Sequence, residues 1–314
     1  MSSSPLPQLS IQVVTWAAEK PAGWKPLFDR ARAADLAGVD RLVVSDHVVF
    51  GENLGAYGDA ALGGSAGARQ PTGPDGHWLE PLTTLSVIAG LTSTIRLGTN
   101  ILLAALRRPV VLAKTAATLD TLSDGRLDLG VGVGWQREEY DAAGLDFAER
   151  GALLDHSLTV CQTLWRDTRS SVADGYLRFE NIHAMPKPAQ SGGVPLWISG
   201  TVNPRVIRRV AAFGSGWIPW GPSAADVGSA IARMREGLAA IGHDPTGLQV
   251  VGNLGAAKNA NGSFDLAATM ARVPALVAAG VTDVRAALPI PADASAAEAF
   301  LSEVVAEFRV TTGR

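Results

Sequence analysis

A strand-length run of aliphatic residues followed by a helix-length amphipathic stretch recurs eight times along the chain. Consecutive parallel strands need a crossover connection, so this alternation predicts a parallel sheet covered by helices. Eight such units with no low-complexity linker favour one domain, residues 1–314, folded as a closed (β/α)8 TIM barrel. An open, doubly wound sheet is the alternative. The predicted strands span residues 9–15, 41–45, 96–103, 126–135, 195–199, 216–220, 248–256 and 284–288.

Helical patterns follow these strands at residues 27–37, 82–91, 110–122, 151–164, 203–213, 225–241, 266–279 and 295–308. Three insertions break the rhythm, after strand 2, after strand 4 and before strand 5. The first contains Gly51–Trp78, and the third, 166–194, contains a predicted short strand at Tyr176–Phe179. Long connections in compact domains are commonly functional, so these three segments are candidates for a lid.

The fourth predicted strand has an unusual composition. Its sequence, Arg-Leu-Asp-Leu-Gly-Val-Gly-Val-Gly-Trp, places aliphatic residues on one face and leaves the other face almost bare. Glycine destabilises a strand by about 0.5–1 kcal/mol relative to alanine, so three glycines in register need an explanation. Close packing against a neighbouring backbone is one explanation. The hypothesis that we favour is a bed for a flat cofactor, formed by Gly132, Val133, Gly134 and Trp135.

Composition and charge exclude several classes of protein. The net charge is −3 and no basic run is interleaved with aromatic residues, which argues against nucleic acid as a partner. No apolar run approaches the roughly 20 residues of a membrane helix, and Met1–Ser10 does not read as a signal peptide. Cys161 is the only cysteine, which fits a cytoplasmic location and predicts a buried, unreactive thiol. The five histidines lack metal-ligand spacing, so no metal site is predicted.

In a TIM barrel the chemistry takes place at the carboxyl ends of the strands. Asp46 and His47 stand at the end of the second predicted strand. Histidine titrates near neutral pH and can donate or accept a proton, so His47 is predicted to be catalytic. Asp46 is predicted to assist it, either by orienting the ring or by bonding the backbone nearby. A purely structural histidine is the alternative.

A turn of small residues, Ser199-Gly200-Thr201, lies between the fifth predicted strand and a helix opened by Asn203-Pro204. Free backbone N–H groups at a helix N-terminus bind anions, and the helix dipole favours negative charge there. The turn is therefore a predicted cofactor-binding element, to which Arg205 could add charge. Ordinary helix capping is the alternative.

Four tryptophans fall at predicted strand ends. Aromatic side chains at the mouth of a barrel can form the walls of a pocket for a flat ligand. Trp16, Trp135 and Trp220 are therefore predicted to line the substrate pocket. For Trp217 we favour ordinary core packing.

Taken together, these residues resemble the bacterial luciferase-like superfamily of flavin- and deazaflavin-dependent enzymes. The resemblance covers nearly the whole chain. It rests on Ser45-Asp-His47, Leu97-Gly-Thr-Asn-Ile-Leu102, Leu112-Ala-Lys-x-Ala-Ala-Thr-Leu-Asp120, Ser123-Asp-Gly-Arg-Leu127, Gly130-Val-Gly-Val-Gly-Trp135, Arg137-Glu-Glu-Tyr140, Phe147-Ala-Glu-Arg150 and Phe179 with Met185-Pro-Lys-Pro188.

The resemblance implies a (β/α)8 barrel that holds an isoalloxazine-type ring in its mouth. The family's non-proline cis peptide, which presses against that ring, maps to Asn100–Ile101. The ring-lining histidine maps to His47, and the phosphate-binding turn maps to Gly200–Thr201. Dimerisation is common in the superfamily, so a homodimer is expected.

Within the superfamily, the Ser-Asp-His triplet and the glycine run resemble the branch that uses the deazaflavin coenzyme F420. This resemblance implies hydride transfer between the deazaflavin and a small enone, aldehyde or alcohol. Sugar-phosphate-oxidising relatives carry an acidic residue where this chain has Trp135, which argues against that substrate. The alternatives are an FMN-dependent monooxygenase, a non-catalytic flavin- or deazaflavin-binding protein, and a flavin-free barrel lyase or hydrolase.

Overall fold

The computed structural model describes residues 6–60 and 64–314. Within these residues, eight parallel strands close into a barrel in which each strand pairs with the next one along the chain and β14 pairs with β1. The (β/α)8 prediction is confirmed, and the open-sheet alternative is wrong. The barrel strands are β1 (Gln8–Gln12), β3 (Arg41–Val44), β5 (Arg96–Thr99), β6 (Leu127–Val131), β9 (Leu196–Gly200), β10 (Gly216–Pro219), β11 (Gln249–Gly255) and β14 (Asp283–Ala287).

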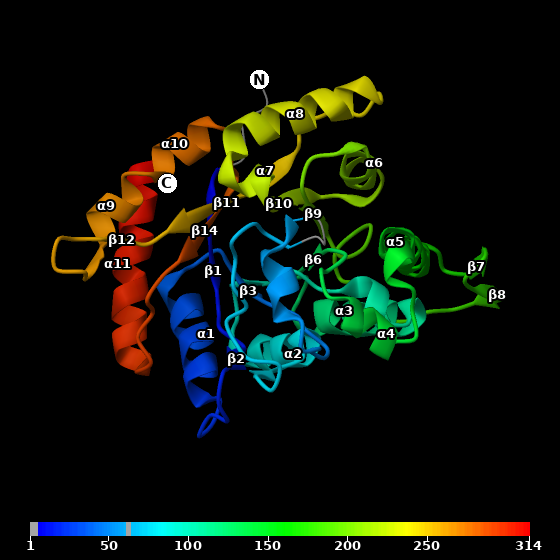
Figure 1. Cartoon of the computed structure of the whole chain (residues 1–314), viewed down its shortest axis with the longest axis horizontal. Coiled ribbons are helices and arrows are strands. Elements are labelled where there is room, and N and C mark those ends of the chain that lie inside the picture. The colour runs from blue at the N-terminus through cyan, green and yellow to red at the C-terminus, as the bar shows by residue number, and fades with distance from the viewer. Residues whose placement is uncertain (1–5, 61–63) are drawn as a thin grey trace.

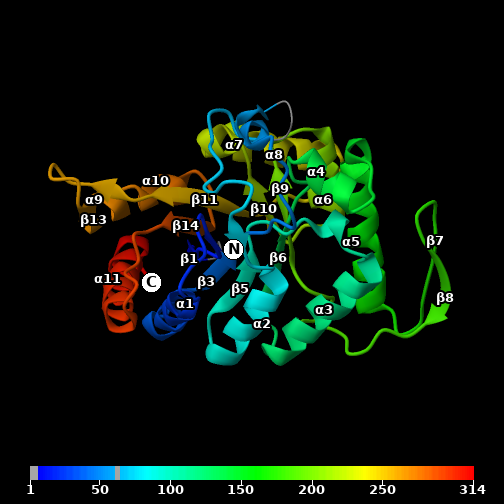
Figure 2. The same cartoon turned by 60° about the horizontal axis from the view of Figure 1, so that its bottom comes forward.

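Helices surround the barrel, with the first helix, α1, beside the last, α11, so that the two ends of the chain close the ring (Figures 1 and 2). Most begin at or next to a proline, which loses no hydrogen bond in the first helical turn. The outer helices are α1 (Lys25–Ala37), α2 (Pro81–Leu91), α3 (Pro109–Leu122), α5 (Arg150–Arg166), α6 (Pro204–Phe213), α8 (Val227–Ala240), α9 (Leu266–Met270), α10 (Val273–Ala278) and α11 (Ala294–Thr312). Among the described residues, none of the helices is both long and apolar enough to cross a membrane.

Each barrel strand separates two cores. Leu196 and Ile198 of β9 face the helices and join the large cluster there, whereas Trp197 between them belongs to a small second cluster with Ile218 and Val251. This separation follows from the two-residue period of a strand, which sends neighbouring side chains to opposite faces. The second cluster therefore fills the barrel interior.

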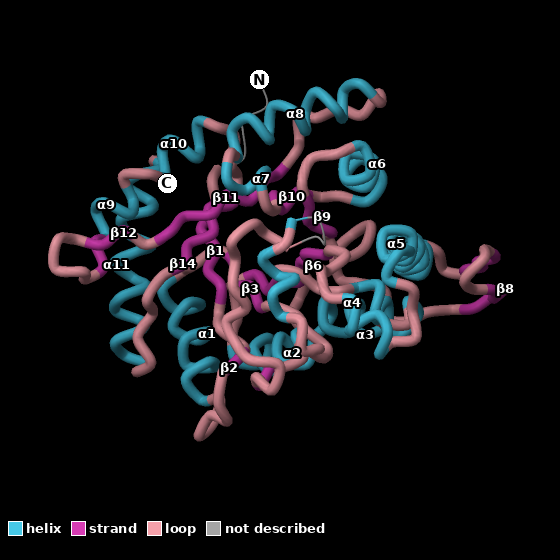
Figure 3. Tube along the Cα trace, in the orientation of Figure 1, coloured by secondary structure: helices cyan, strands magenta, loops and turns pink. Residues whose placement is uncertain are grey.

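Several short elements decorate the barrel (Figure 3). A hairpin of β7 and β8 projects beyond α5 in both cartoon views, where the sequence predicted one short strand (Figures 1 and 2). The short elements are β2 (Trp16–Ala17), η1 (Leu54–Gly58), β4 (His77–Trp78), η3 (Ala104–Leu106), α4 (Arg137–Ala142), η4 (Phe147–Glu149), β7 (Ser170–Ala173), β8 (Arg178–Ile182), α7 (Pro222–Ala225), β12 (Ala257–Lys258) and β13 (Phe264–Asp265).

Two predicted helices are each divided in two. The 225–241 prediction is wrong at its start, because Asp226 caps α8 by accepting a hydrogen bond from the Ser229 N–H at 3.2 Å. The 266–279 prediction spans α9 and α10, and Pro274 stands in the first turn of α10. Proline has no N–H to continue the hydrogen-bond ladder of a preceding helix, but it suits the first turn of a new one.

Candidate functional site

A cavity of about 490 Å3 lies at the carboxyl ends of the barrel strands. Its lining includes the predicted residues His47, Asn100, Ile101, Gly132, Val133, Gly134, Trp135, Ser199 and Gly200, together with Trp16 and Trp220. The structure therefore brings almost all of the predicted site residues into one place. The sequence analysis did not single out the lining residues Gln12, Tyr57 and Trp78.

The peptide bond between Asn100 and Ile101 is cis, as the resemblance implied. Both residues line the cavity just beyond the end of β5. The Ile101 side chain also packs against the cluster of Trp197, Ile218 and Val251 inside the barrel. Ile101 therefore connects the packed barrel interior to the cavity above it.

The polar side chains that line the cavity are oriented by a chain of hydrogen bonds that begins at Arg285. Its Nη1 donates to Asn100 Oδ1 at 2.8 Å, Asn100 Nδ2 donates to Gln12 Oε1 at 3.4 Å, and Gln12 Nε2 donates to Ser45 Oγ at 2.7 Å. Arginine can only donate, so each following group must accept on the arginine side and donate on the other. The cavity wall is thereby set to present N–H and O–H donors to a ligand.

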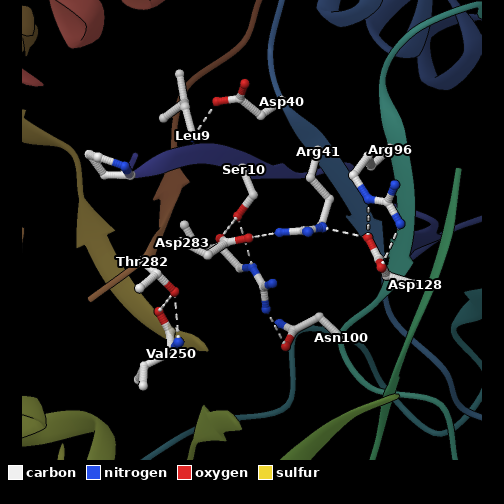
Figure 4. A network of polar contacts seen from close by, with 12 residues as sticks. Leu9, Ser10, Asp40, Arg41, Arg96, Asn100, Asp128, Val250, Thr282 and Asp283 are labelled. Carbon is white, nitrogen blue, oxygen red and sulfur yellow. Dashed lines mark hydrogen bonds and ion pairs between the residues drawn. The ribbon is translucent and has the colours of Figure 1, made fainter. Parts of the chain in front are cut away.

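Arg285 belongs to a buried network in the barrel interior, part of which Figure 4 shows. There, Asp283 accepts from Ser10 and Arg41, and Asp128 accepts from Arg41 at 3.0 Å and from Arg96 at 2.7 Å. Burial, with a smaller contribution from Arg41, lowers the pKa of Arg285 to about 9, so the guanidinium is still protonated at neutral pH. Arg41 and Arg96 are paired with these carboxylates, whereas Arg285, which contacts Ser10 and Asn100, has no ion pair within the described part of the chain.

His47 is held by a carboxylate that the sequence analysis did not identify. Its Nδ1 lies 3.2 Å from Glu139 Oε1, and the same oxygen accepts a hydrogen bond from the Val48 N–H at 2.8 Å. In this arrangement neutral His47 donates from Nδ1, which leaves Nε2 as the nitrogen that can exchange a proton with a ligand. The Glu139 side chain is 1% exposed, and its Oε2 has no hydrogen-bond partner within the described part of the chain.

The Asp46 carboxylate bonds Arg107 and the backbone rather than the His47 ring. Its buried carboxylate accepts from Arg107 Nη1 at 2.6 Å and Nη2 at 3.1 Å, and from the Leu103 N–H at 2.8 Å. Burial alone would lower the pKa of Arg107, but Asp46 and Glu80 raise it on balance. The other prediction, that Asp46 bonds the backbone nearby, is confirmed. Asp46 therefore holds the backbone of the loop that follows the cis peptide. The carboxylate that contacts the His47 ring is that of Glu139.

The glycine run forms two structures rather than one bare strand. β6 ends at Val131, so the predicted strand 126–135 is too long, and Gly134 has a φ of 72°, which no strand residue adopts. At Gly130 a Cβ would lie 2.0 Å from the Thr99 carbonyl oxygen, so close backbone packing explains this glycine. At Gly132 a Cβ would instead meet the Ile101 side chain, 2.8 Å away, at the cavity wall. Close packing therefore explains Gly130, and the cofactor bed stays a prediction for Gly132, Val133, Gly134 and Trp135.

Tyr140 fixes the backbone of the glycine loop at Val133, which lines the cavity. Tyr140 Oη donates to the Val133 carbonyl at 2.6 Å, and burial raises the pKa of Tyr140 far above its ordinary value. The phenol therefore stays protonated and remains a donor. Because Tyr140 and Glu139 are neighbours on α4, one short helix positions both the glycine loop and His47.

Several aromatic rings line the cavity and contact one another. Trp16 stacks on Trp78 with ring centroids 4.8 Å apart, and the His47 ring lies 4.9 Å from Trp78 and 5.7 Å from Trp135. Tyr57 lies between Trp135 and Trp220, at 5.4 Å and 6.2 Å. Trp16, Trp135 and Trp220 line this cavity, and the prediction that it is the substrate pocket stays a prediction. Trp217 is buried and donates to the Gly200 carbonyl at 3.0 Å, as its predicted core position requires.

The turn after β9 is more strongly capped than the sequence indicated. The Thr201 hydroxyl donates to the Trp220 carbonyl at 2.9 Å, and Thr201 lies outside the cavity lining. Asn203 Oδ1 accepts from the N–H groups of Arg205 and Val206, at 2.9 Å and 3.1 Å. The capping alternative is therefore correct for these two amides. Only Ser199 and Gly200 of the predicted turn line the cavity.

Comparison with known proteins identifies the family. The profile described as luciferase-like monooxygenase matches residues 9–261. A Mycobacterium tuberculosis relative, phthiodiolone/phenolphthiodiolone dimycocerosates ketoreductase, is 31% identical over 172 residues, which cover 53% of this chain and 44% of the relative.

Two solved structures have the same fold at low sequence identity. The monooxygenase RslO1 from Streptomyces bottropensis superposes with a TM-score of 0.71 and 20% identity, covering 95% of this chain and 98% of that one. An F420-dependent secondary alcohol dehydrogenase in complex with an F420-acetone adduct gives 0.73 and 16%, covering 97% and 99%.

Proposed function

The chain belongs to the luciferase-like monooxygenase family, and from this membership we propose that it is an oxidoreductase that uses deazaflavin coenzyme F420. The substrate that we propose is a small enone, aldehyde or alcohol. Relatives and neighbours are described as a ketoreductase and a secondary alcohol dehydrogenase, which supports chemistry at a carbonyl or alcohol carbon.

The observation that carries this proposal is the polarity of the cavity. Asn100, Gln12 and Ser45 are held as donors by the Arg285 guanidinium, which has no ion pair within the described residues. The pyrimidine edge of a flavin or deazaflavin presents carbonyl oxygens and a ring nitrogen, and this edge becomes more negative when the ring is reduced. Preorganised donors would bind the oxygens and the nitrogen of that edge. The positive charge of Arg285 would stabilise the negative charge of the reduced ring.

When bound, the ring would supply the hydride chemistry, while the protein supplies binding, orientation and electrostatics. His47, fixed through Nδ1 by Glu139, would hold or move the substrate proton at Nε2. The walls formed by Trp16, Trp78 and Trp135 would exclude water from the reacting atoms.

A cofactor titration tests the proposal. Purified apoprotein is titrated separately with coenzyme F420 and with FMN while the ring fluorescence is followed, and the loaded protein is then assayed with enones, aldehydes and alcohols. Binding of F420 with turnover is the expected result. Tight binding of FMN without binding of F420 would replace the proposal with an FMN-dependent monooxygenase, for which the shared fold of RslO1 is the supporting observation.

Binding without turnover of any substrate would favour a non-catalytic flavin- or deazaflavin-binding protein.

His47→Ala tests the role of the histidine, with His243→Ala at an exposed position as the matched control. We expect the His47 variant to lose about 10²–10⁴-fold in turnover with little change in cofactor affinity, since this is the usual contribution of general acid–base catalysis. The homodimer remains a prediction, which light scattering of the purified protein can check.

A further inference from the structure

Two polar side chains of the first insertion, Arg69 and Gln70, line the cavity and have no part in the chemistry described above. They stand in the connection between β3 and α2. The donors Gln12, Ser45 and Asn100, by contrast, stand at the ends of barrel strands or just beyond them. The cavity therefore has a second polar region, which the insertion supplies and the barrel does not.

The segment that carries these two residues is anchored on both sides. Before it, the Ser65 N–H donates to the Tyr57 carbonyl at 2.9 Å. After it, Trp78 Nε1 donates to Thr72 Oγ1 at 3.0 Å. Tyr57 and Trp78 line the cavity themselves. Residues 69–71 therefore connect two points that are fixed at the cavity wall.

Arg69 presents a positive charge to the cavity. Asp46 and Arg69 are the lining residues whose side chains are fully charged at neutral pH. Asp46 is paired with Arg107 at 2.6 Å, and the buried carboxylate of Glu139 does not line the cavity. Arg69 is exposed and has no hydrogen bond or ion pair within the described part of the chain. Its charge is therefore available to an anionic group of a ligand.

Neutral donors accompany this charge. Gln70 Nε2 is buried and has no hydrogen-bond partner among residues 6–60 and 64–314. A buried donor without a partner is destabilising, and an acceptor on a ligand would remove that cost. Burial also raises the pKa of Tyr57, so its hydroxyl stays protonated and can donate. An anion at this wall would meet one charge and two neutral donors.

The single charge indicates which anion fits. A guanidinium binds a carboxylate through two parallel hydrogen bonds, and the two charges balance. A phosphate monoester carries a charge of about −1.5 to −2 at pH 7, which Arg69 alone would not balance. The rest of the wall is aromatic, with Trp16 stacked on Trp78 at 4.8 Å. This combination suits a ligand that has an apolar body and one carboxylate.

We propose that Arg69 and Gln70 determine substrate specificity by binding a carboxylate at the end of the substrate away from the reacting carbon. This inference rests on the proposed function, and it narrows the substrate to an enone, aldehyde or alcohol that also carries a carboxylate. The apolar body of the substrate would lie along the aromatic wall. His47, whose ring lies 4.9 Å from that of Trp78, would face the reacting end.

Matched pairs of acid and ester test the inference. Para-carboxybenzaldehyde and para-carboxybenzyl alcohol are each compared with their methyl esters, by calorimetric titration of the purified protein and by turnover of the F420-loaded enzyme. Wild type should bind each acid about tenfold more tightly than its ester, because only the acid pairs with the guanidinium. Added salt should weaken the binding of the acids more than that of the esters.

Variants assign the preference to particular side chains. Arg69→Gln should bring the ratio of acid affinity to ester affinity close to one, and Arg69→Lys, which keeps the charge, should retain part of the preference. Gln70→Leu should lower the ratio by less, because it removes a neutral donor. Arg32→Gln, at an exposed position on α1, is the matched control and should keep the wild-type ratio. Arg69 is exposed, so its variants keep the test informative if Gln70→Leu does not fold.

Three outcomes would overturn the inference. Wild type may show no preference for acid over ester, Arg69→Gln may keep the wild-type ratio, or Arg69→Gln may lose acid and ester affinity equally, as a merely structural residue would. The proposed function fails separately. A preference for the acids without turnover refutes the oxidoreductase and leaves the carboxylate site, whereas equal turnover of acids and esters supports the oxidoreductase and removes the carboxylate site.

Discussion

Alanine substitution of Gly130 and of Gly132, one at a time, distinguishes a packing role from a binding role within the same glycine run. At Gly130 the new Cβ would lie 2.0 Å from the Thr99 carbonyl oxygen and 2.9 Å from Ile218 Cδ1. The nearer atom is backbone of the adjacent strand β5, so it can move only if the pairing of β5 with β6 is disturbed. Overpacking of this kind costs about 1–3 kcal/mol, and we expect the upper end of that range.

The expected change in melting temperature follows from the size of the chain. An unfolding entropy of about 2.1 cal/mol/K per residue over 314 residues gives about 0.66 kcal/mol/K. A loss of about 3 kcal/mol therefore lowers the Tm of Gly130→Ala by about 5 °C.

At Gly132 the new Cβ would lie 2.8 Å from Ile101 Cδ1, against at least 3.4 Å for an ordinary contact. The end of the Ile101 side chain can move away by that difference, so we expect a cost below about 1 kcal/mol and a Tm within about 2 °C of wild type. Ile101 lines the cavity, however, and its displaced methyl group would occupy space meant for the ring. Affinity for the cofactor should fall about tenfold or more.

Thermal unfolding followed by circular dichroism and a fluorescence titration with F420 or FMN, on the same preparations, measure both quantities. Wild-type affinity in Gly132→Ala would refute the binding role of Gly132. An unchanged Tm in Gly130→Ala would refute the close backbone contact assigned to Gly130.

Three further predictions concern other parts of the molecule. Glu139→Ala should lower turnover by about tenfold or more. Glu139→Gln should retain more activity, because it keeps an oxygen for Nδ1 of His47 and for the Val48 N–H. Equal losses in the two variants would show that Glu139 does not position His47. Burial tends to raise the pKa of Asp35, but hydrogen bonds from the N–H groups of Ile95, Ser93 and Thr94 outweigh it and lower the pKa from 3.8. The ionised Asp35 therefore stabilises the fold above pH 3.8, and this stabilisation is lost as the pH falls through the lower folded-state pKa. The Tm of Asp35→Asn should be below that of wild type at pH 7, and the difference should shrink below pH 3.8. A difference in Tm that does not depend on pH would contradict this prediction. Burial raises the pKa of the Cys161 thiol to about 12, so the native protein should resist alkylation at pH 8 and react only after denaturation, as mass spectrometry can show.

Most of the fold was predictable because periodicity is local information. The alternation of aliphatic residues identifies strands such as 41–45, and a parallel arrangement of eight units follows from the helices between them. Strand ends were less predictable. The predicted strand 96–103 is observed only as Arg96–Thr99, because the chain turns into the cavity wall at Asn100 and Ile101.

The site was predicted only where a general rule connects position in the fold to chemistry. His47 and the tryptophans were identified because the mouth of a barrel is where its strands end. Glu139 was missed because it stands in Arg137-Glu-Glu, a run that reads as a solvated helix face. It is 1% exposed because it lies against the loop after β3, where its Oε1 meets His47 Nδ1 and the Val48 N–H.

The sequence by itself determined the barrel, the end of it where the candidate site lies and the residue types available there, since each depends on neighbours along the chain. The tertiary structure alone decided which polar groups pair with one another. Asp46 pairs with Arg107 rather than with His47, and Arg285, 185 residues from Asn100, orients the donors of the cavity. A buried polar side chain must satisfy its hydrogen bonds with the groups that surround it in space, and those groups come from strands far apart in sequence.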